Sequence, residues 1–180
     1  MKKFAYILFF ISSLSANAQK SSTNSDVNNL SNKLNYRVLN AYQENASTKI
    51  EDVFHYFQLL TDKSLNTKVK NEIILNINQL FNNQNPILLD ITSENLDKIE
   101  LEKLIKKLLI SEPIMFKISN QNNYNSVTLN SWINNYTLIK TKSGFNKTIS
   151  IVQTIFMEEE IKQFGVNFKT VWVTYLGEMQ

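Results

Sequence analysis

SVTLNSWINNYTLIKTKSGFNKTISIVQTIFME, residues 126–158, is the segment from which the architecture of this chain follows. Apolar and polar residues alternate on both sides of KSGFN, and a period of two is typical of strands with one buried face. Glycine and asparagine between two such runs indicate a turn. We therefore predict two long antiparallel strands, at 126–141 and 148–158.

Two further runs extend this pattern in both directions along the chain. Ile114, Phe116 and Ile118 alternate with polar residues before it, and the run 166–176 follows the turn KQFG. Consecutive strands joined by short Asn- and Gly-containing turns predict an antiparallel meander, and long strands must twist or bulge to remain in one compact domain. The acidic run 158–160 is expected at a strand end, exposed to solvent.

The residues before the meander have helical spacing. Thr48-Lys49-Ile50-Glu51 matches a capping box, and apolar residues three and four apart then predict a helix that ends near Asp62. A second helix is expected from about Thr67 to Phe81, antiparallel to the first because the linker is short.

A third helix is expected between these two helices and the meander. The short apolar run 87–91 predicts a buried strand. Ser93 or Asn95 is then expected to cap a helix that Pro113 stops.

Helices with one apolar stripe and a sheet with one apolar face each need a cover. The sequence therefore predicts a single α+β domain at 48–180, in which three or four N-terminal helices pack on a curved antiparallel sheet. Residues 19–47 are expected to form a flexible lead-in that contains a narrow helical stripe from Val27 to Tyr42.

This order of elements, over residues 49–177, resembles the nuclear-transport-factor-2-like (cystatin-like) superfamily. The resemblance implies a curved sheet that wraps a helical layer into a cone. The superfamily usually has a β-hairpin before its last helix, where this sequence shows one strand at 87–91. Its members include isomerases, dehydratases and many non-catalytic pocket or dimerisation modules, so the resemblance does not choose a function.

The first 18 residues have the three parts of a secretory signal. Lys2 and Lys3 precede the apolar run 4–11, and small residues stand at Ala16 and Ala18. A membrane span needs about 20 apolar residues, so we expect a cleaved signal peptide. The alternatives are an ordinary first helix or a mitochondrial presequence, although a presequence would be rich in arginine. The product is expected to be soluble, in the periplasm of a bacterium or outside the cell.

Composition narrows the range of chemistry. The 19 basic and 16 acidic residues nearly balance once the two leader lysines are removed. The basic residues form no cluster in the sequence, so nucleic-acid binding is not expected. The chain has no cysteine and one histidine, so neither disulfides nor the usual zinc sites are expected. We predict no cofactor and no metal. His55 should point away from the apolar stripe of its helix, as a surface residue.

Aromatic residues on two predicted strands supply the candidate binding site. Trp132 and Tyr136 lie four apart on one strand, and Phe168 and Trp172 repeat this spacing on the last strand. If the two faces coincide, they would line a cavity for a small apolar ligand or a partner segment. The alternative is that the rings fill the core under the helices.

Three functions follow from these observations. The first is an exported, non-catalytic binding or interaction module. The second is a cofactor-independent isomerase or hydrolase, for which Asp90, Tyr136 and Glu112 would be the first residues to test. The third is a structural, envelope-associated homodimer whose sheet face is buried against its twin.

Overall fold

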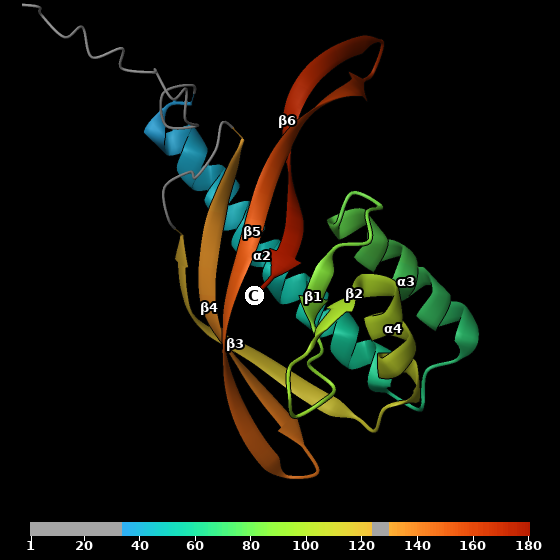
Figure 1. Ribbon diagram of the computed structural model, residues 1–180. Helices are drawn as coiled ribbons and strands as arrows, with labels where there is room; N and C mark the ends of the chain where they lie inside the picture. The colour runs from blue at the N-terminus through green and yellow to red at the C-terminus, as the bar shows by residue number, and fades with distance from the viewer. Residues whose placement is uncertain (1–33, 124–129) are drawn as a thin grey trace, which may run out of the picture.

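The computed structural model describes residues 34–123 and 130–180. In these ranges, three helices accompany a four-stranded antiparallel sheet and a small two-stranded sheet. The α+β prediction, with helices on a curved sheet, agrees with this arrangement (Figure 1). The predicted signal peptide at 1–18 lies outside the described residues. Across the two described ranges, no helix has both the length and the apolar character needed to cross a membrane.

Helix α2, Tyr36–Thr61, is one continuous helix where the sequence predicted a break. It begins after Asn35, whose side chain accepts a hydrogen bond from the Arg37 backbone N–H at 2.8 Å. Thr48 lies in the helix interior, and its hydroxyl donates to the Glu44 carbonyl at 3.2 Å. This bond to the preceding turn satisfies the hydroxyl inside the helix. Since no helix begins at Thr48, the predicted capping box is wrong.

Helix α3, Thr67–Leu80, confirms the second predicted helix. Its N-cap is Asn66, whose side-chain oxygen accepts from the Val69 N–H at 3.0 Å. The helix packs beside the C-terminal half of α2 (Figure 1). Its buried residues are Ile73 and Ile77.

A β-hairpin precedes the last helix, where the sequence predicted one strand. Strand β1, Ile87–Leu89, pairs antiparallel with β2, Lys98–Glu100. The chain turns after β1 because the Asp90 carboxylate accepts from both the backbone N–H and the hydroxyl of Thr92. This turn ends the predicted 87–91 strand after Leu89.

The helix after this hairpin begins later than predicted. Helix α4, Leu101–Ile110, follows β2 directly and has Glu100 as its N-cap. Ser93 and Asn95, the predicted caps, lie in the loop between β1 and β2 instead.

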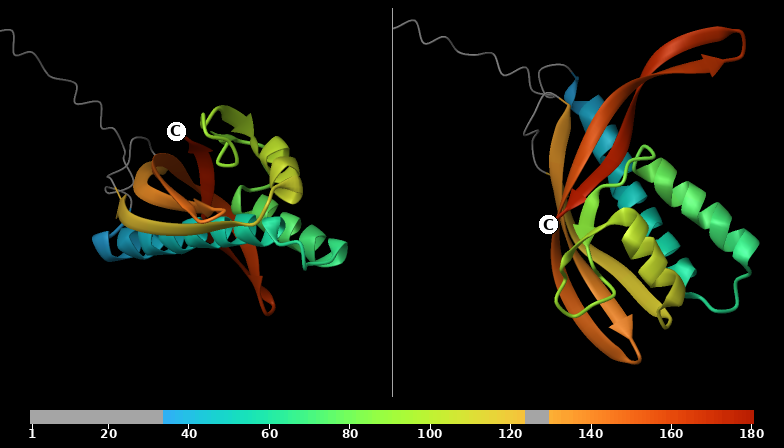
Figure 2. Two further views of the ribbon diagram at one scale, coloured as in Figure 1. Left: turned by 90° about the horizontal axis from the view of Figure 1, so that it is seen from below. Right: turned by 45° about the vertical axis from the view of Figure 1, so that its right-hand side comes forward.

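The four remaining strands form the predicted meander in the order β3-β4-β5-β6, each antiparallel to the next (Figure 2). Their bounds are Ile114–Asn123, Ser131–Lys142, Phe145–Phe164 and Asn167–Met179. Strand β5 is longer than predicted and contains the acidic run 158–160, which was expected beside a turn. The turn comes later, at Gly165 and Val166, where Gly165 supplies a φ of +64°.

The core lies between the helices and one face of this sheet, which we call the helix face. Helix α2 contacts both β3 and β6 and therefore crosses this face. Its buried side chains include Ile50, Phe54 and Phe57. The buried residues opposite them on β4 and β5 are Trp132, Tyr136, Leu138, Ile149, Ile151, Ile155 and Met157.

Candidate functional site

The strand register places the four aromatic residues of the predicted site on the helix face. On β5, the residues opposite Tyr136, Trp132, Trp172 and Phe168 are Ile151, Ile155, Glu159 and Gln163, respectively. These β5 positions are four apart, and side chains at even spacing share one face of a strand. The four aromatic residues therefore lie on the same face of the sheet, as the predicted shared site requires.

Two of these rings belong to the core. Trp132 is 1% exposed and Tyr136 is 3% exposed, and the Tyr136 ring lies edge-on to Phe54 at 5.9 Å between centroids. The Tyr136 hydroxyl donates to Oε1 of Gln153 at 2.8 Å, and burial raises the pKa of Tyr136 well above its usual value. In this part of the sheet, the alternative that the rings fill the interior describes what the structure shows.

The other two aromatic residues lie where β5 and β6 leave the body of the protein. We call residues 158–173 the arm; it projects as a two-stranded hairpin beyond the helices (Figures 1 and 2). All residues at 161–170 are exposed. Phe168 is 68% exposed, whereas Trp172, closer to the body, packs partly against the core. The arm therefore presents aromatic side chains to solvent.

The residues proposed for catalysis have separate surroundings. The buried Asp90 carboxylate forms an ion pair with Lys107 and accepts from Thr92. Burial raises the pKa of Asp90, but the hydrogen bonds from Lys107 and Thr92 outweigh this effect and lower it. Glu112 is exposed after α4. Asp90 therefore anchors the loop between β1 and β2. Its hydrogen-bond partners, Lys107 and Thr92, are not those of Tyr136, which bonds to Gln153.

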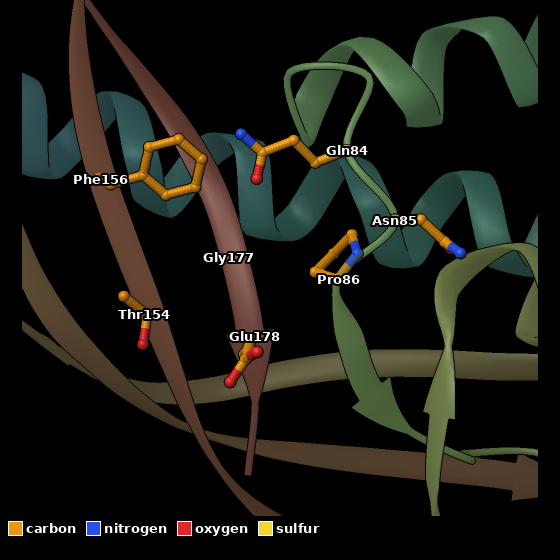
Figure 3. Close-up of a pocket in the computed structure, with 7 residues that line it drawn as sticks. All are labelled: Gln84, Asn85, Pro86, Thr154, Phe156, Gly177 and Glu178. Atoms are coloured by element: carbon orange, nitrogen blue, oxygen red, sulfur yellow. The ribbon is translucent and has the colours of Figure 1, made fainter.

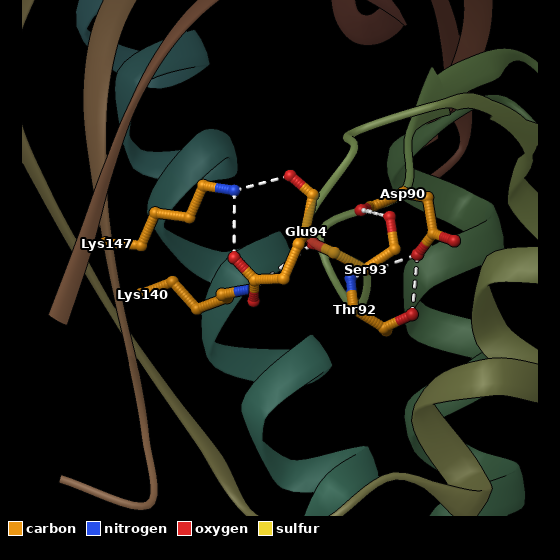
Figure 4. A network of polar contacts seen from close by, with 6 residues as sticks. All are labelled: Asp90, Thr92, Ser93, Glu94, Lys140 and Lys147. Atoms are coloured by element: carbon orange, nitrogen blue, oxygen red, sulfur yellow. Dashed lines mark hydrogen bonds and ion pairs between the residues drawn. The ribbon is translucent and has the colours of Figure 1, made fainter. Parts of the chain in front are cut away.

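A cluster of charges lies where this loop meets the turn between β4 and β5 (Figure 4). Lys140 and Lys147 are direct cross-strand partners, and the carboxylate of Glu94 bridges them, with Oε1 at 3.3 Å from Lys140 and Oε2 at 3.1 Å from Lys147. The cleft beside them has a volume of about 500 Å³. We call it the lysine cleft; its lining residues are Glu94, Lys140, Lys142, Ser143, Phe145, Asn146 and Lys147.

A second cleft, of about 320 Å³, lies between the segment before β1 and the strands β5 and β6 (Figure 3). Its lining residues are Gln84, Asn85, Pro86, Thr154, Phe156, Gly177 and Glu178. Neither of these clefts is lined by Trp132 or Trp172.

Groups that could hold a metal ion are absent from residues 34–123 and 130–180, since no three His, Asp or Glu side chains there come together. His55 is exposed on α2, as the sequence predicted.

Comparison of the chain with protein families, curated proteins and solved structures found no match.

The lysine cluster was not predicted from the sequence, although one signal for it is present there. Lys140 follows Trp132, Tyr136 and Leu138 at even spacing on β4, so it occupies a buried position of the alternation. A lysine at such a position needs a partner. The partner, Glu94, lies 46 residues away in the sequence, and spacing alone does not reveal it.

Proposed function

We propose that this chain is an exported interaction module and that its arm pairs with the arm of a second copy through the outer edge of β6. The proposal is carried by the exposure of an apolar hairpin. Within 161–170, Ile161, Phe164, Val166 and Phe168 are between 51% and 91% exposed. An isolated two-stranded hairpin is marginally stable in water, and an exposed apolar edge strand is a template for another strand.

The sequence of β6 is self-complementary about Thr170. If two β6 strands pair antiparallel with Thr170 at the centre, Phe168 of each copy lies opposite Trp172 of the other. Both aromatic residues are on the helix face, so the two cross-strand pairs form on the same side. Aromatic pairs and Thr–Thr pairs each contribute about 0.2–1 kcal/mol. The proposed partner segment is therefore β6 of a second copy, which lies beside the aromatic residues at the sheet edge and not against their face.

Charge favours the same register. Lys162 and Lys169 are direct partners within one arm, and like charges in opposite positions destabilise a sheet. In the proposed pairing, Lys169 lies opposite Val171 of the second copy. Glu160, the β5 partner of Val171, already forms an ion pair with Lys162 at 3.4 Å. The pairing additionally brings Glu160 of the second copy into the same row of side chains as Lys169.

Other observations support export, the likeness to a superfamily and a non-catalytic role. Export rests on the leader pattern in residues 1–18. The β1–β2 hairpin before α4 supports the proposed likeness to the nuclear-transport-factor-2-like superfamily. That superfamily usually has such a hairpin, where only one strand was predicted from the sequence. A non-catalytic role is supported by the ion pair of Asp90 with Lys107, which occupies the one buried carboxylate among the three residues proposed for catalysis.

Sedimentation of the 19–180 product over a wide concentration range tests the pairing. We expect a reversible dimer for the unmodified chain. Thr170→Lys would place two ammonium groups at the centre of the pairing and weaken the dimer by about tenfold or more, or about 1.4 kcal/mol. Thr170→Val, which has nearly the same shape, should still dimerise.

Complementary charge gives a stricter form of this test. Thr170→Glu alone should also dissociate, while an equimolar mixture of Thr170→Lys and Thr170→Glu should form a mixed dimer. A chain that sediments as a monomer at every concentration, or a Thr170→Lys variant that dimerises as well as the unmodified chain, would contradict the proposal.

A further inference from the structure

The end of the helix face at the β4–β5 turn holds more positive charge than its neighbours balance. Lys140 and Lys147 are direct cross-strand partners, and the side chain of Lys140 is only 3% exposed. Like charges directly opposite each other destabilise a sheet, and a buried ammonium group is costly unless an anion pairs with it. This part of the fold therefore requires an anion.

Glu94 supplies that anion from the loop between β1 and β2. Its two carboxylate oxygens bridge Lys140 and Lys147 (Figure 4), and hydrogen bonds from Lys147 and Lys140 lower the pKa of Glu94. The carboxylate side chain itself is 77% exposed. A carboxylate thus fits between the two ammonium groups. The Glu94 carboxylate occupies this position while most of its side chain is exposed to solvent.

One glutamate does not complete the site. Lys142 also lines the cleft, so three lysines face one glutamate among its lining residues. The buried Lys140 ammonium makes two hydrogen bonds, to the Ser93 carbonyl and to Glu94, each at 3.3 Å. Both are longer than the usual range for N–H···O hydrogen bonds, about 2.7–3.2 Å.

We propose that the lysine cleft binds a small organic carboxylate, which takes the place of the Glu94 side chain between Lys140 and Lys147. The volume of about 500 Å³ lies within the range of small-molecule sites. Phe145 lines the cleft and is 82% exposed, so it offers an apolar contact to the rest of the ligand. The class of ligand is a monocarboxylate with an apolar or aromatic group, and the site is independent of the arm.

Calorimetric titration with benzoate tests this site, with benzamide as the uncharged analogue and inorganic phosphate as a different anion. Glu94→Ala removes the internal competitor, so it should bind benzoate about tenfold more tightly than the unmodified chain. Glu72→Ala removes an exposed glutamate of α3, away from the cleft, and should bind benzoate like the unmodified chain. Adding Lys147→Met to Glu94→Ala should abolish the gain, and benzamide should bind to none of the variants.

Circular dichroism of each variant separates lost binding from lost folding. Should Glu94→Ala fail to fold, Glu94→Gln keeps the shape of the side chain, removes its charge and should show the same gain. Equal benzoate affinity in the folded Glu94 and Glu72 variants would overturn the proposal. So would phosphate binding without benzoate binding, since the cleft would then be an unspecific anion site.

Discussion

The two ends of strand β5 carry the same arrangement of charge in opposite surroundings. At one end Lys147 lies opposite Lys140, and at the other Lys162 lies opposite Lys169. The first pair lies on the helix face beneath the loop between β1 and β2, and the Glu94 carboxylate from that loop bridges its two ammonium groups. The second pair stands on the exposed arm. A cross-strand pair of lysines is thus partly buried or exposed according to whether another element covers that part of the strand.

The same contrast holds for the apolar residues of β5. Ile151 and Ile161 are ten positions apart and share one face, yet Ile151 is 1% exposed and Ile161 is 74% exposed. Helices cover the first and not the second. The covered part contributes to the stability of the fold, whereas the apolar side chains of the arm are exposed to solvent.

Matched substitutions of these two isoleucines give the largest expected difference. Ile151→Ala should lower the free energy of unfolding by about 3 kcal/mol because it leaves a cavity in the core. Ile161→Ala should change it by less than about 0.5 kcal/mol, as at other exposed positions. Urea unfolding at a concentration where the chain is monomeric measures both. Similar losses would mean that the arm packs against the body.

A smaller effect is expected at Asp90, which anchors the loop that covers the first lysine pair. Asp90→Asn should lower the free energy of unfolding by about 2 kcal/mol at neutral pH, since it leaves Lys107 without its buried partner. Because the pKa of Asp90 is lowered in the folded state, its carboxylate stabilises the fold above the pKa of the unfolded chain, and this stability is lost as the pH falls through the folded-state pKa.

The difference between the unmodified chain and Asp90→Asn should therefore shrink on acidification. Urea unfolding at neutral pH and at successively lower pH measures it. Asp97→Asn, an exposed position in the same loop, is the control and should differ little from the unmodified chain at any pH. A difference that stays constant into strong acid would show that Asp90 acts through its shape and not through its charge.

The sequence predicted the meander and α3 because periodicity and turn residues are local signals. It failed where a distant contact decides the outcome. The segment 98–100 is too short to show a period and becomes a strand only by pairing with β1. A local ambiguity caused the other error: Thr48 has the pattern of a cap, but its hydroxyl donates to the Glu44 carbonyl within a longer helix.

Neither candidate site was fully visible in the sequence, for the same reason. The aromatic spacing at Phe168 and Trp172 was found, yet their exposure depends on how far the helices extend over the sheet. The lysine cleft depends on Glu94, which the turn at Asp90 brings to the sheet. In both cases the missing information is the placement of a covering element.

The turns at the two ends of β5 give the smallest expected effect and the finest comparison. Gly144 and Gly165 have φ values of +81° and +64°, and no atom lies within 4 Å of an added Cβ at either position. Alanine at each site therefore introduces backbone strain of about 1 kcal/mol without a clash. The two substitutions are equal in local chemistry and differ only in what surrounds the turn.

Gly144→Ala should lower the global free energy of unfolding by about that amount, because Glu94 and the lysines tie this turn to the body. Gly165→Ala should leave global unfolding unchanged and instead speed hydrogen exchange of the amides at 161–170, because the arm can open alone. Urea unfolding and amide exchange of the monomer measure the two quantities. If Gly165→Ala lowered global stability as much as Gly144→Ala, the arm would unfold together with the body, and its exposed apolar face would have to be explained by packing within one chain.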